Sequence, residues 1–353
     1  MNRAEAHGNG LASPEVVVGE TPPPGWLDLV AHAPEATFFH LPVWTEALVR
    51  TVPGCAPLWL AATRDDRLVG GMVGVARRRG VLRRLASHFE GTAGGPLVKT
   101  ALPADQRRDV ARALLAAWTR LARRPTVVAA EMILPPASDA AWRAEALAAG
   151  WRRRDLTAAV LPLTGGVAAV EYGVFPKNRR NERNRSRRRG CVAGVATDAA
   201  PLDEYYPIYR AAARRWGVTP APRQLLVELL TRSGGAAFLS WVRWEGRLIG
   251  GHLCLHHRDD VTAWLGATAS AHNDKFPATL LVWTDIEEAC RRQALRLDLG
   301  GSGGSASIAR FKELLGAHAE VRGHYTVASW PYAAWRRLCR HAGDPVGRKG
   351  DAA

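Results

Sequence analysis

A repeated motif constrains the fold of this chain more than any other feature of its sequence. Arg67–Gly71 (RLVGG) recurs as Arg247–Gly251 (RLIGG), 180 positions later. In both places an apolar strand and a polar turn precede the motif, and further short strands and one long helix follow it. Five matched residues can arise by chance, but the matched order of elements around them favours a duplication. We therefore predict two related halves with a ligand-binding cleft between them.

The expected elements alternate between strands and helices in both halves. In the first half we expect helices at 44–51, 104–123 and 138–149 and strands at 57–63, 126–134 and 155–163. In the second half we expect helices at 202–216, 223–231 and 277–293 and strands at 237–242, 296–299 and 321–328. Mixed sheets flanked by helices, built twice, give an α/β or α+β chain.

Three segments are expected to lie outside the two halves. Residues 1–25, which end in three prolines and a glycine, are expected to be a disordered tail, and residues 165–176 a linker. This places the first domain at 26–164 and the second, with its basic N-terminal segment, at 177–330. Residues 331–353 are expected to form a C-terminal helix and tail. The apolar stripe of that helix, for which packing on the first half is favoured over membrane contact, consists of Tyr332, Trp335, Leu338 and Cys339.

Composition limits the class of protein. With 353 residues and 47% hydrophobic content the chain can bury a large core, and its net charge of +15 predicts an anionic partner such as phosphates, RNA or a membrane surface. The five cysteines are far apart and lack C-x-x-C spacing, so neither a disulfide framework nor a zinc site is expected. No signal peptide or membrane-spanning run is expected either. The cytoplasm is therefore the expected compartment.

A dense basic segment opens the second half. Lys177–Arg189 (KNRRNERNRSRRR) holds eight cations and one anion, Glu182, and its other residues are Asn and Ser. The pattern offers no apolar face, so we expect the segment to be solvated or covered by an anionic partner. Phosphates of a nucleotide, of tRNA or of an anionic lipid suit the planar fork of arginine, and a merely solvated helix is the alternative. Because no aromatic residues interleave with the cations, sequence-specific RNA recognition is disfavoured.

The stretch Leu297–Gly316 has the arrangement of a ligand site. A short apolar strand leads into a loop rich in glycine and serine and then into a helix that carries Phe311 and Lys312. Glycines let a ligand approach the backbone, the first helical turn offers unpaired N–H groups, and a lysine can stabilise an oxyanion. A flexible connector is the alternative for such a loop. Phe311 indicates that this face is partly covered, which would strengthen a charge interaction of Lys312.

Other ionisable side chains are candidates for chemistry or for structure. Asp298 enters the loop and can orient an amine or accept its proton, although a turn carboxylate explains it equally well. His252, Cys254 and His256 share one face of an apolar strand, and we interpret these histidines as hydrogen-bonded core residues rather than metal ligands. No motif of a metalloprotease or a P-loop nucleotidase occurs, so these classes have no support.

Together these features resemble the Fem-type branch of the GNAT acyltransferase superfamily, which includes the peptidoglycan bridge-forming aminoacyltransferases and many acetyltransferase-like proteins. The long helical-hairpin arm of some tRNA-dependent members is not evident between Leu202 and Ser233, which weakens an aminoacyl-tRNA donor without excluding it. The matching motifs, spread over roughly residues 37–328, are FFHLPVW at 38–44, GGP at 94–96, KNRRNERNRSRRRG at 177–190, WLGAT at 264–268, PATLLVWTDI at 277–286 and LDLGGS to FKELLG at 297–316.

The resemblance implies two tandem GNAT-like domains, each a mixed, mainly antiparallel sheet flanked by helices. It implies an N-acyltransferase that moves an acyl group from an activated donor, most simply acyl-CoA, to a primary amine of a cell-envelope precursor or small metabolite. The alternatives are an aminoacyl-tRNA-dependent aminoacyltransferase of the peptidoglycan-bridge type and a non-catalytic protein that binds RNA or anionic lipid. The donor is a co-substrate, and neither a permanently bound cofactor nor a metal is expected. Further expected partners are tRNA and an anionic membrane surface.

The resemblance also assigns residues. The lysine of the Phe-Lys motif assists acyl transfer in this family, and that position is Lys312 here. The catalytic candidates are therefore Lys312 and, as an orienting carboxylate, Asp298. The basic segment is similar to the family's phosphate-contacting helix. The candidates for binding donor or substrate are Gly300, Gly301, Ser302, Phe311, Arg179, Arg183, Arg187, Trp264 and Trp44.

Overall fold

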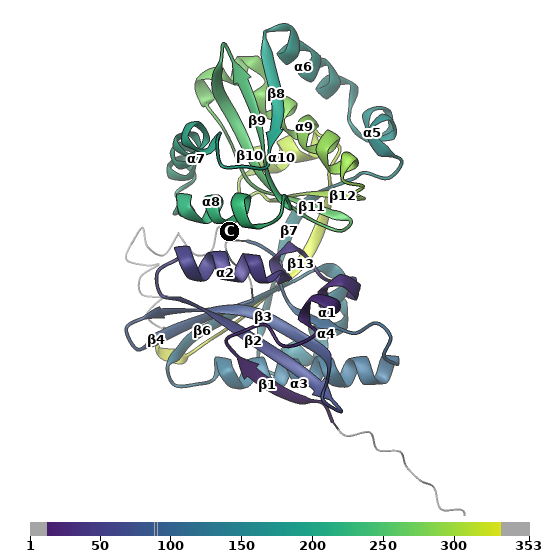
Figure 1. The fold of residues 1–353 in the computed structure, drawn as a ribbon, viewed down its shortest axis with the longest axis vertical. Coiled ribbons are helices and arrows are strands. Elements are labelled where there is room, and N and C mark those ends of the chain that lie inside the picture. The colour runs from purple at the N-terminus through teal and green to yellow at the C-terminus, as the bar shows by residue number, and fades with distance from the viewer. Residues whose placement is uncertain (1–12, 88, 90, 333–353) are drawn as a thin grey trace, which may run out of the picture.

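The computed structural model describes residues 13–87, 89 and 91–332, which form two lobes joined by long strands (Figure 1). The elements of the first half are β1 (Glu15–Gly19), α1 (Trp26–His32), a 3₁₀ turn (Phe38–His40), α2 (Pro42–Thr51), β2 (Cys55–Arg64), β3 (Arg67–Arg79), β4 (Leu82–Ala86), β5 (Pro96–Val98), α3 (Ala104–Ala122), β6 (Val127–Leu134), α4 (Pro136–Ala148) and β7 (Arg152–Pro162).

The second half repeats this order behind a short helical connection. Its elements are α5 (Gly166–Ala169), a π-helical turn (Val170–Val174), α6 (Lys177–Arg188), β8 (Cys191–Ala196), α7 (Leu202–Trp216), α8 (Arg223–Arg232), β9 (Ala237–Trp244), β10 (Arg247–His257), β11 (Asp260–Thr268), a 3₁₀ turn (Ser270–Lys275), α9 (Pro277–Arg291), β12 (Arg296–Gly301), α10 (Ala306–Glu313) and β13 (His318–Ala328). Most elements predicted from the sequence therefore occur, with shifted ends.

The repeated motif has the same structure in both halves. Each copy begins a strand after a two-residue hairpin turn, Asp65-Asp66 or Glu245-Gly246, and all four turn residues have positive φ, which matches the turn to the twist of the strands. The third motif residue, Val69 or Ile249, is the extra residue of a β-bulge in each copy. One hairpin with one bulge, found twice, supports the duplication.

The last glycine of each copy makes room for an aromatic ring. A Cβ atom on Gly71 would lie 2.6 Å from the ring of Trp26, and one on Gly251 would lie 2.5 Å from the ring of Tyr205. Trp26 belongs to α1 and Tyr205 to α7, so in each half a helix packs its ring directly on the backbone of the sheet. The two glycines therefore serve packing rather than flexibility.

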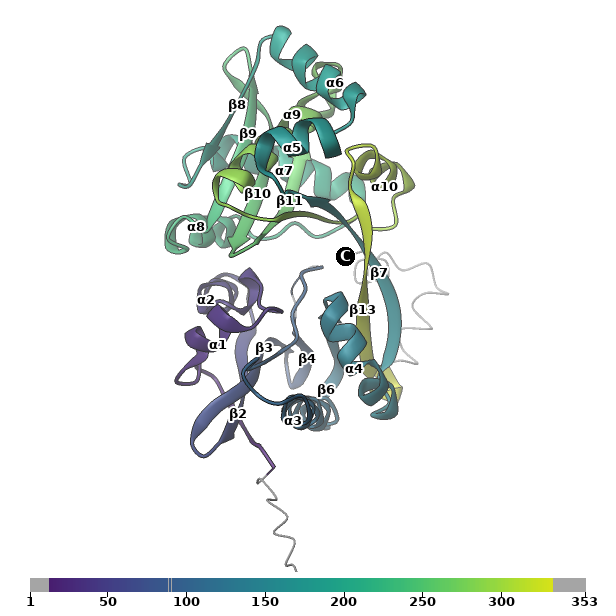
Figure 2. The ribbon, with the colours of Figure 1, turned by 90° about the vertical axis from the view of Figure 1, so that its right-hand side faces the viewer.

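The halves exchange their last strands. Among the described residues one 13-stranded sheet has the order β1-β2-β3-β4-β6-β13-β7-β12-β11-β10-β9-β8, with β5 beside β3. Thus β13 pairs with β6 of the first half, β7 pairs with β12 of the second half, and β7 and β13 pair with each other. Figure 2 shows this pair running along one side of the molecule through both lobes. The sheet is therefore continuous. A domain boundary near residue 164 assigns β7 and β13, which pair with each other, to different domains.

The expectation of a disordered tail over residues 1–25 is wrong for its second part. Glu15–Gly19 forms the edge strand β1, which pairs antiparallel with β2 from Glu15 opposite Thr63 to Gly19 opposite Trp59. The three valines of β1 suit a pleated edge, and the hydrogen bonds to β2 fix the segment.

The expectation of a plain linker over residues 165–176 is also wrong. Val170 and Phe175 are buried, and the Phe175 ring lies 5.1 Å from that of Trp283 on α9. This segment therefore packs on the second half, because it carries apolar side chains at helical spacing. Most of the C-terminal stripe, from Trp335 to Cys339, lies outside the described residues.

The halves meet through α2 and α8 and through an aromatic contact. Trp44 of α2 meets Trp264 of β11 edge to face, with ring centroids 5.0 Å apart. Such a pair stabilises by about 0.5–1.5 kcal/mol beyond its buried area. The Trp44 ring also contacts Phe38, Phe39 and Phe89 on the first-half side. The predicted cleft between the halves is therefore filled by aromatic side chains at this point. No helix among the described residues is both long and apolar enough to span a bilayer.

Candidate active site

The sheet of the second half opens into a fork between β11 and β12. These strands run parallel for only three pairs, which end with Thr262 opposite Asp298. Beyond that point β11 stays with β10 as far as Thr268, whereas β12 stays with β7, its partner from Arg296 onward, as far as Gly301. Within the described residues, the edge of 263–268 that faces β12 therefore has no ladder partner. Backbone N–H and C=O groups in the middle of a sheet need partners, so this edge is suited to an extended ligand.

The same place in the first half is closed. Here β4 and β5 together take the position of β11, and the chain between them turns onto β6. The Ser87 N–H donates to the Glu131 carbonyl oxygen (3.1 Å), and the Gly94 N–H donates to the Ile133 carbonyl oxygen (3.0 Å). A Cβ atom on Gly94 would lie 1.9 Å from the Ser87 carbonyl oxygen, so only glycine fits. The GGP turn thus fills the first fork, and the open fork belongs to the second half.

A β-bulge in β11 lies just beyond the last β11–β12 pair. The register with β10 passes from Leu253 opposite Leu265 to Cys254 opposite Ala263, which leaves Trp264 as the extra residue. The Trp264 ring meets Trp44, and its Nε1 atom is buried without a hydrogen-bond partner among the described residues. The bulge therefore directs Trp264 toward the first half at the mouth of the fork.

The loop after β12 is held by Lys312. Its Nζ atom donates to three backbone carbonyl oxygens, those of Leu299 (2.6 Å), Gly300 (3.0 Å) and Gly301 (2.7 Å). Gly300 has a φ of 71°, a left-handed conformation that lets consecutive carbonyls converge on one ammonium. All three protons of Lys312 are thereby used. The ammonium sits on the diverging end of β12, and burial lowers its pKa to about 8 although the charge of Asp298 opposes the shift.

Asp298 is a buried carboxylate with both oxygens engaged. Its Oδ1 accepts from the Gly300 N–H (2.7 Å), and its Oδ2 accepts from Arg322 (2.6 Å). In this arrangement it shapes the turn and anchors β13, as the turn-carboxylate alternative predicts. The neighbouring Asp260 lies 2.9 Å from Arg296. Burial and the negative charge of Asp298 raise the pKa of Asp260 to about 7. This partly buried charge network ties β11, β12 and β13 together at the base of the fork.

The basic segment forms α6, and the expectation that it has no buried face is wrong. Arg183 is 6% exposed, pairs with Glu171 (2.6 Å) and lies over the Trp283 ring, 4.3 Å from its centroid. Arg179 pairs with Glu182 (2.6 Å) and lies over the Phe311 ring. Guanidinium planes stack on aromatic rings, so arginines here do the packing that apolar residues usually do. The cations of the segment that remain exposed are Lys177, Arg185, Arg187, Arg188 and Arg189.

Two cavities lie away from the fork. One of about 500 Å³ lies beside β8 and α9, with Arg187, Glu287 and Arg291 among its lining residues. The other, of about 320 Å³, is lined by α3 and α4 of the first half together with Glu35 and Val98. Lys312 and Asp298 line neither cavity, so the predicted single groove does not unite the candidates. The candidates fall into four places: the end of β12 with Ser302, Phe311 and Arg179, the Trp44–Trp264 contact, the buried face of α6 with Arg183, and the exposed face of α6 with Arg187.

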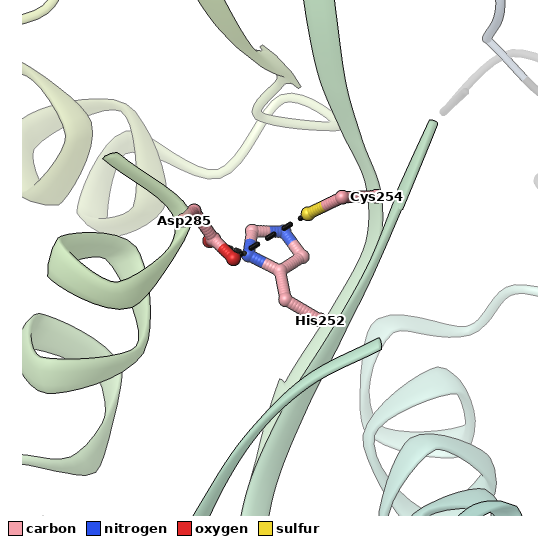
Figure 3. Close-up of side chains that lie close together, drawn as sticks. All are labelled: His252, Cys254 and Asp285. Atoms are coloured by element: carbon pink, nitrogen blue, oxygen red, sulfur yellow. Dashed lines mark hydrogen bonds and ion pairs between the residues drawn. The ribbon is translucent and has the colours of Figure 1, made fainter. Parts of the chain in front are cut away.

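One cluster was not foreseen from the sequence (Figure 3). His252 Nδ1 lies 2.7 Å from Asp285 Oδ2, and the Cys254 thiol donates to Asp285 Oδ1 (3.4 Å). The shared face of His252 and Cys254 was predicted, but Asp285 comes from α9. Its signal is a carboxylate near the end of the apolar segment PATLLVWTDI, where burial demands a partner.

Comparisons with known proteins agree with this architecture. Residues 175–313 match the acetyltransferase (GNAT) domain family. FemX is similar in structure (TM-score 0.68, 12% identity, 89% of this chain and 97% of FemX). A tandem GNAT protein from the clavulanic acid biosynthesis pathway, solved without AcCoA, has a TM-score of 0.58 and 18% identity over 89% of this chain and 98% of that one. L-PGS from Bacillus licheniformis has a TM-score of 0.55 and 13% identity over 94% and 98%. No curated protein sequence matches.

Proposed function

We propose that this chain, which has a tandem GNAT fold and a GNAT acetyltransferase domain at residues 175–313, is an N-acyltransferase that acts on a primary amine. The proposed donor is acyl-CoA, and the proposed acceptor is a cell-envelope precursor or a small metabolite. The observation that carries the proposal is the open fork between β11 and β12, which lies inside the matched residues. The similar tandem GNAT protein from the clavulanic acid biosynthesis pathway is described with reference to AcCoA, and this supports acyl-CoA as the donor.

The fork suggests how the donor binds. An extended acyl thioester can follow the free edge of residues 263–268 and complete the backbone hydrogen bonds that β12 leaves unmade. Backbone N–H groups of that edge would then stabilise negative charge on the carbonyl oxygen as the amine attacks. Holding both reactants in line lowers the entropic barrier of the reaction. The cytoplasm, where CoA thioesters are made, stays the expected compartment.

Lys312 and Asp298 are proposed to shape the fork. In this structure each proton of the Lys312 ammonium faces a backbone carbonyl, so the lysine fixes the path of Leu299–Gly301. Asp298 supports the same turn through the Gly300 N–H. The positive charge of Lys312 at the rim also favours a developing oxyanion nearby. We therefore propose Lys312 as a positioning residue with an electrostatic contribution, and Asp298 as its support.

Donor binding tests the proposal directly. Purified protein is titrated with CoA and acetyl-CoA by calorimetry, and thiol release is followed with a panel of primary amines. Binding of acetyl-CoA together with amine-dependent thiol release is the expected result. A ligand present at 100 times its Kd would also raise stability by about 2.7 kcal/mol. If the protein binds neither acetyl-CoA nor charged tRNA, both enzymatic proposals fall.

The second candidate is an aminoacyltransferase that uses aminoacyl-tRNA, and the exposed cations of α6 favour it. Arg185, Arg187 and Arg188 all reach solvent. If tRNA is the donor carrier, the triple Arg→Ala variant should weaken charged-tRNA binding and flatten its salt dependence, because about one counterion is released for each phosphate contact. CoA binding should not change. A non-catalytic binder of RNA or anionic lipid would instead lose all function with this variant and none with Lys312→Ala.

A further inference from the structure

A closed hydrogen-bonded group joins β10 to α9, the helix that packs on this part of the sheet (Figure 3). Asp285 is fully buried, and both of its carboxylate oxygens are engaged, Oδ2 with His252 Nδ1 (2.7 Å) and Oδ1 with the Cys254 thiol (3.4 Å). A buried carboxylate is costly unless it is paired, so this arrangement has to be complete to be stable. The group therefore fixes the orientation of the imidazole.

The chemistry of the three groups decides where the histidine carries its proton. Burial and the negative charge of Asp285 raise the pKa of the Cys254 thiol well above its ordinary value, so the thiol stays protonated and donates. The remaining oxygen of the carboxylate accepts a hydrogen bond from Nδ1–H of the imidazole. In neutral His252 the lone pair is then on Nε2, which has no hydrogen-bond partner among the described residues. This tautomer follows from the hydrogen-bond network.

That lone pair lies against the strand that borders the fork. His252 of β10 is opposite Gly266 of β11, and Gly266 belongs to the stretch with the free edge. A Cβ atom on Gly266 would lie 2.6 Å from both Nε2 and Cδ2 of the imidazole. Because Gly266 has no side chain, it leaves space for the imidazole ring of His252. The His252 side chain is 12% exposed, so it is sheltered without being sealed off.

We infer that His252 is the catalytic base of the proposed acyl transfer, with Asp285 and Cys254 as positioning residues. The inference rests on the proposed function. The amine nitrogen attacks the thioester carbonyl carbon, a C–N bond forms, and the carbonyl π pair moves to oxygen. One proton passes from nitrogen to His252 Nε2, the C=O bond re-forms, and the C–S bond breaks. The thiolate then leaves with its electron pair and takes the proton from the imidazolium.

A metal ion is the competing explanation of the same cluster, because the three ligand atoms lie within 4.8 Å of one another. A coordinated thiol would lose its proton, whereas this thiol donates a hydrogen bond to Asp285. The hydrogen bonds already satisfy both oxygens of Asp285. The two explanations differ in the state of Nε2 and in metal content, and both can be measured.

The first experiment measures acetyl-CoA turnover with a primary amine for His252→Gln, Gly266→Ala and the control Gly250→Ala. Gln keeps a group that can bond Asp285 but accepts no proton, so kcat should fall by about 100-fold with the acetyl-CoA Kd unchanged. Gly266→Ala should displace the ring and lower kcat similarly. Gly250 lies on β10 opposite Thr268 of β11, and the atom nearest to its Cβ would be a Thr268 methyl carbon at 2.9 Å rather than the imidazole, so Gly250→Ala should stay near wild type.

The second experiment identifies the tautomer without using turnover. In protein labelled with ¹⁵N-histidine, the His252 signal, assigned by its loss in His252→Gln, should show Nδ1–H and an unprotonated Nε2. Asp285→Asn should disturb this pattern, and Cys254→Ser, which keeps a donor, should preserve it better than Cys254→Ala. A proton on Nε2, or stoichiometric zinc whose removal abolishes turnover, overturns the inference. If wild type and His252→Gln are equally active, the assignment of His252 as the base is wrong but the proposed function stands. If wild type shows no turnover, the proposed function and the assignment of the base are both wrong.

Discussion

At the residue scale, the Lys312 ammonium makes three hydrogen bonds to backbone carbonyls near the fork. Lys312→Met keeps the length of the side chain but removes three donors from the carbonyls of Leu299, Gly300 and Gly301. We expect a loss of about 1–3 kcal/mol in the free energy of unfolding, because partly buried carbonyls are left unpaired. Acyl transfer should fall as well, since the rim of the fork is no longer fixed. Urea unfolding and thiol release measure the two effects.

Arg310→Met is the matched control, because this exposed residue of the same helix pairs only with Glu313 among the described residues. Its effect should stay within a few tenths of a kcal/mol, as for other exposed ion pairs. A Lys312→Met variant as stable and as active as wild type would contradict the role assigned to the ammonium.

His40 gives a prediction about pH. Burial lowers the pKa of His40 from 6.5 to about 4, and its ring accepts from the Thr37 N–H while Nε2 lies 3.1 Å from the Gly95 carbonyl oxygen. Between pH 6.5 and 4 the unfolded chain binds the proton more readily, so this contribution to stability is lost as pH falls. The shift corresponds to about 3 kcal/mol. His40→Asn, whose Oδ1 can still accept from Thr37, should show a flatter decline in urea unfolding between pH 7 and 4. An identical decline in the two proteins would contradict this assignment.

At the element scale, a buried carboxylate adds to the β6 ladder that holds β13 on the first half. Asp139 of α4 accepts from the Tyr325 hydroxyl (2.5 Å) and from Arg153 (2.8 Å). Tyr325→Phe should therefore cost about 2 kcal/mol, since hydrogen bonds to charged groups are worth roughly 1.5–3 kcal/mol. Tyr206→Phe removes a bond to the neutral Ala221 carbonyl and should cost about 1 kcal/mol or less. Urea unfolding of both variants checks the order, and a larger loss for Tyr206→Phe would refute it.

The sequence predicts those elements whose signal is local. Hydrophobic periodicity and turn residues locate helices such as α3 and α9 and the hairpin that follows Thr63, because each depends on neighbours in the chain. The edge strand β1 is missed, since five residues beside a run of prolines carry too little periodicity. The exchange of β7 and β13 is also missed, because alternation tells which face of a strand is buried and not which strand lies beside it.

The same distinction explains the outcome for the site. The motifs LDLGGS and FKELLG indicate a loop close to a lysine. They do not reveal that three carbonyl oxygens converge on the Lys312 ammonium, because this depends on the left-handed conformation of Gly300. Charge counting along α6 cannot reveal that Arg183 stacks on Trp283, because that ring comes from α9, a hundred residues later. The Asp285 partner of His252 is likewise set by packing of α9 on the sheet. Contacts between distant segments are where the residue pattern gives least information.

At the scale of the whole molecule, the duplication has led to two different halves. The first fork is filled by the chain around Gly94, and the second fork is open. The first half instead supplies Trp44 to the mouth of the second fork and β7 to the strand that borders it. We interpret the first half as a support for a single site rather than as a second site.

Strand exchange predicts that neither half is stable alone. A fragment of residues 1–164 lacks β13, so β6 is left with β4 alone and β7 loses the strand that joins it to β6. A fragment of residues 165–353 lacks β7 beside β12. Each fragment exposes unpaired, apolar strand edges and should aggregate or remain unfolded when produced alone. Produced together, the two fragments contain every strand and should form a one-to-one complex, detected by size-exclusion chromatography with light scattering. The complex should melt in one transition, because β7 and β13 make the halves a single cooperative unit. A monomeric 165–353 fragment that unfolds cooperatively would contradict this account, since it would mean that the exchanged strand is dispensable.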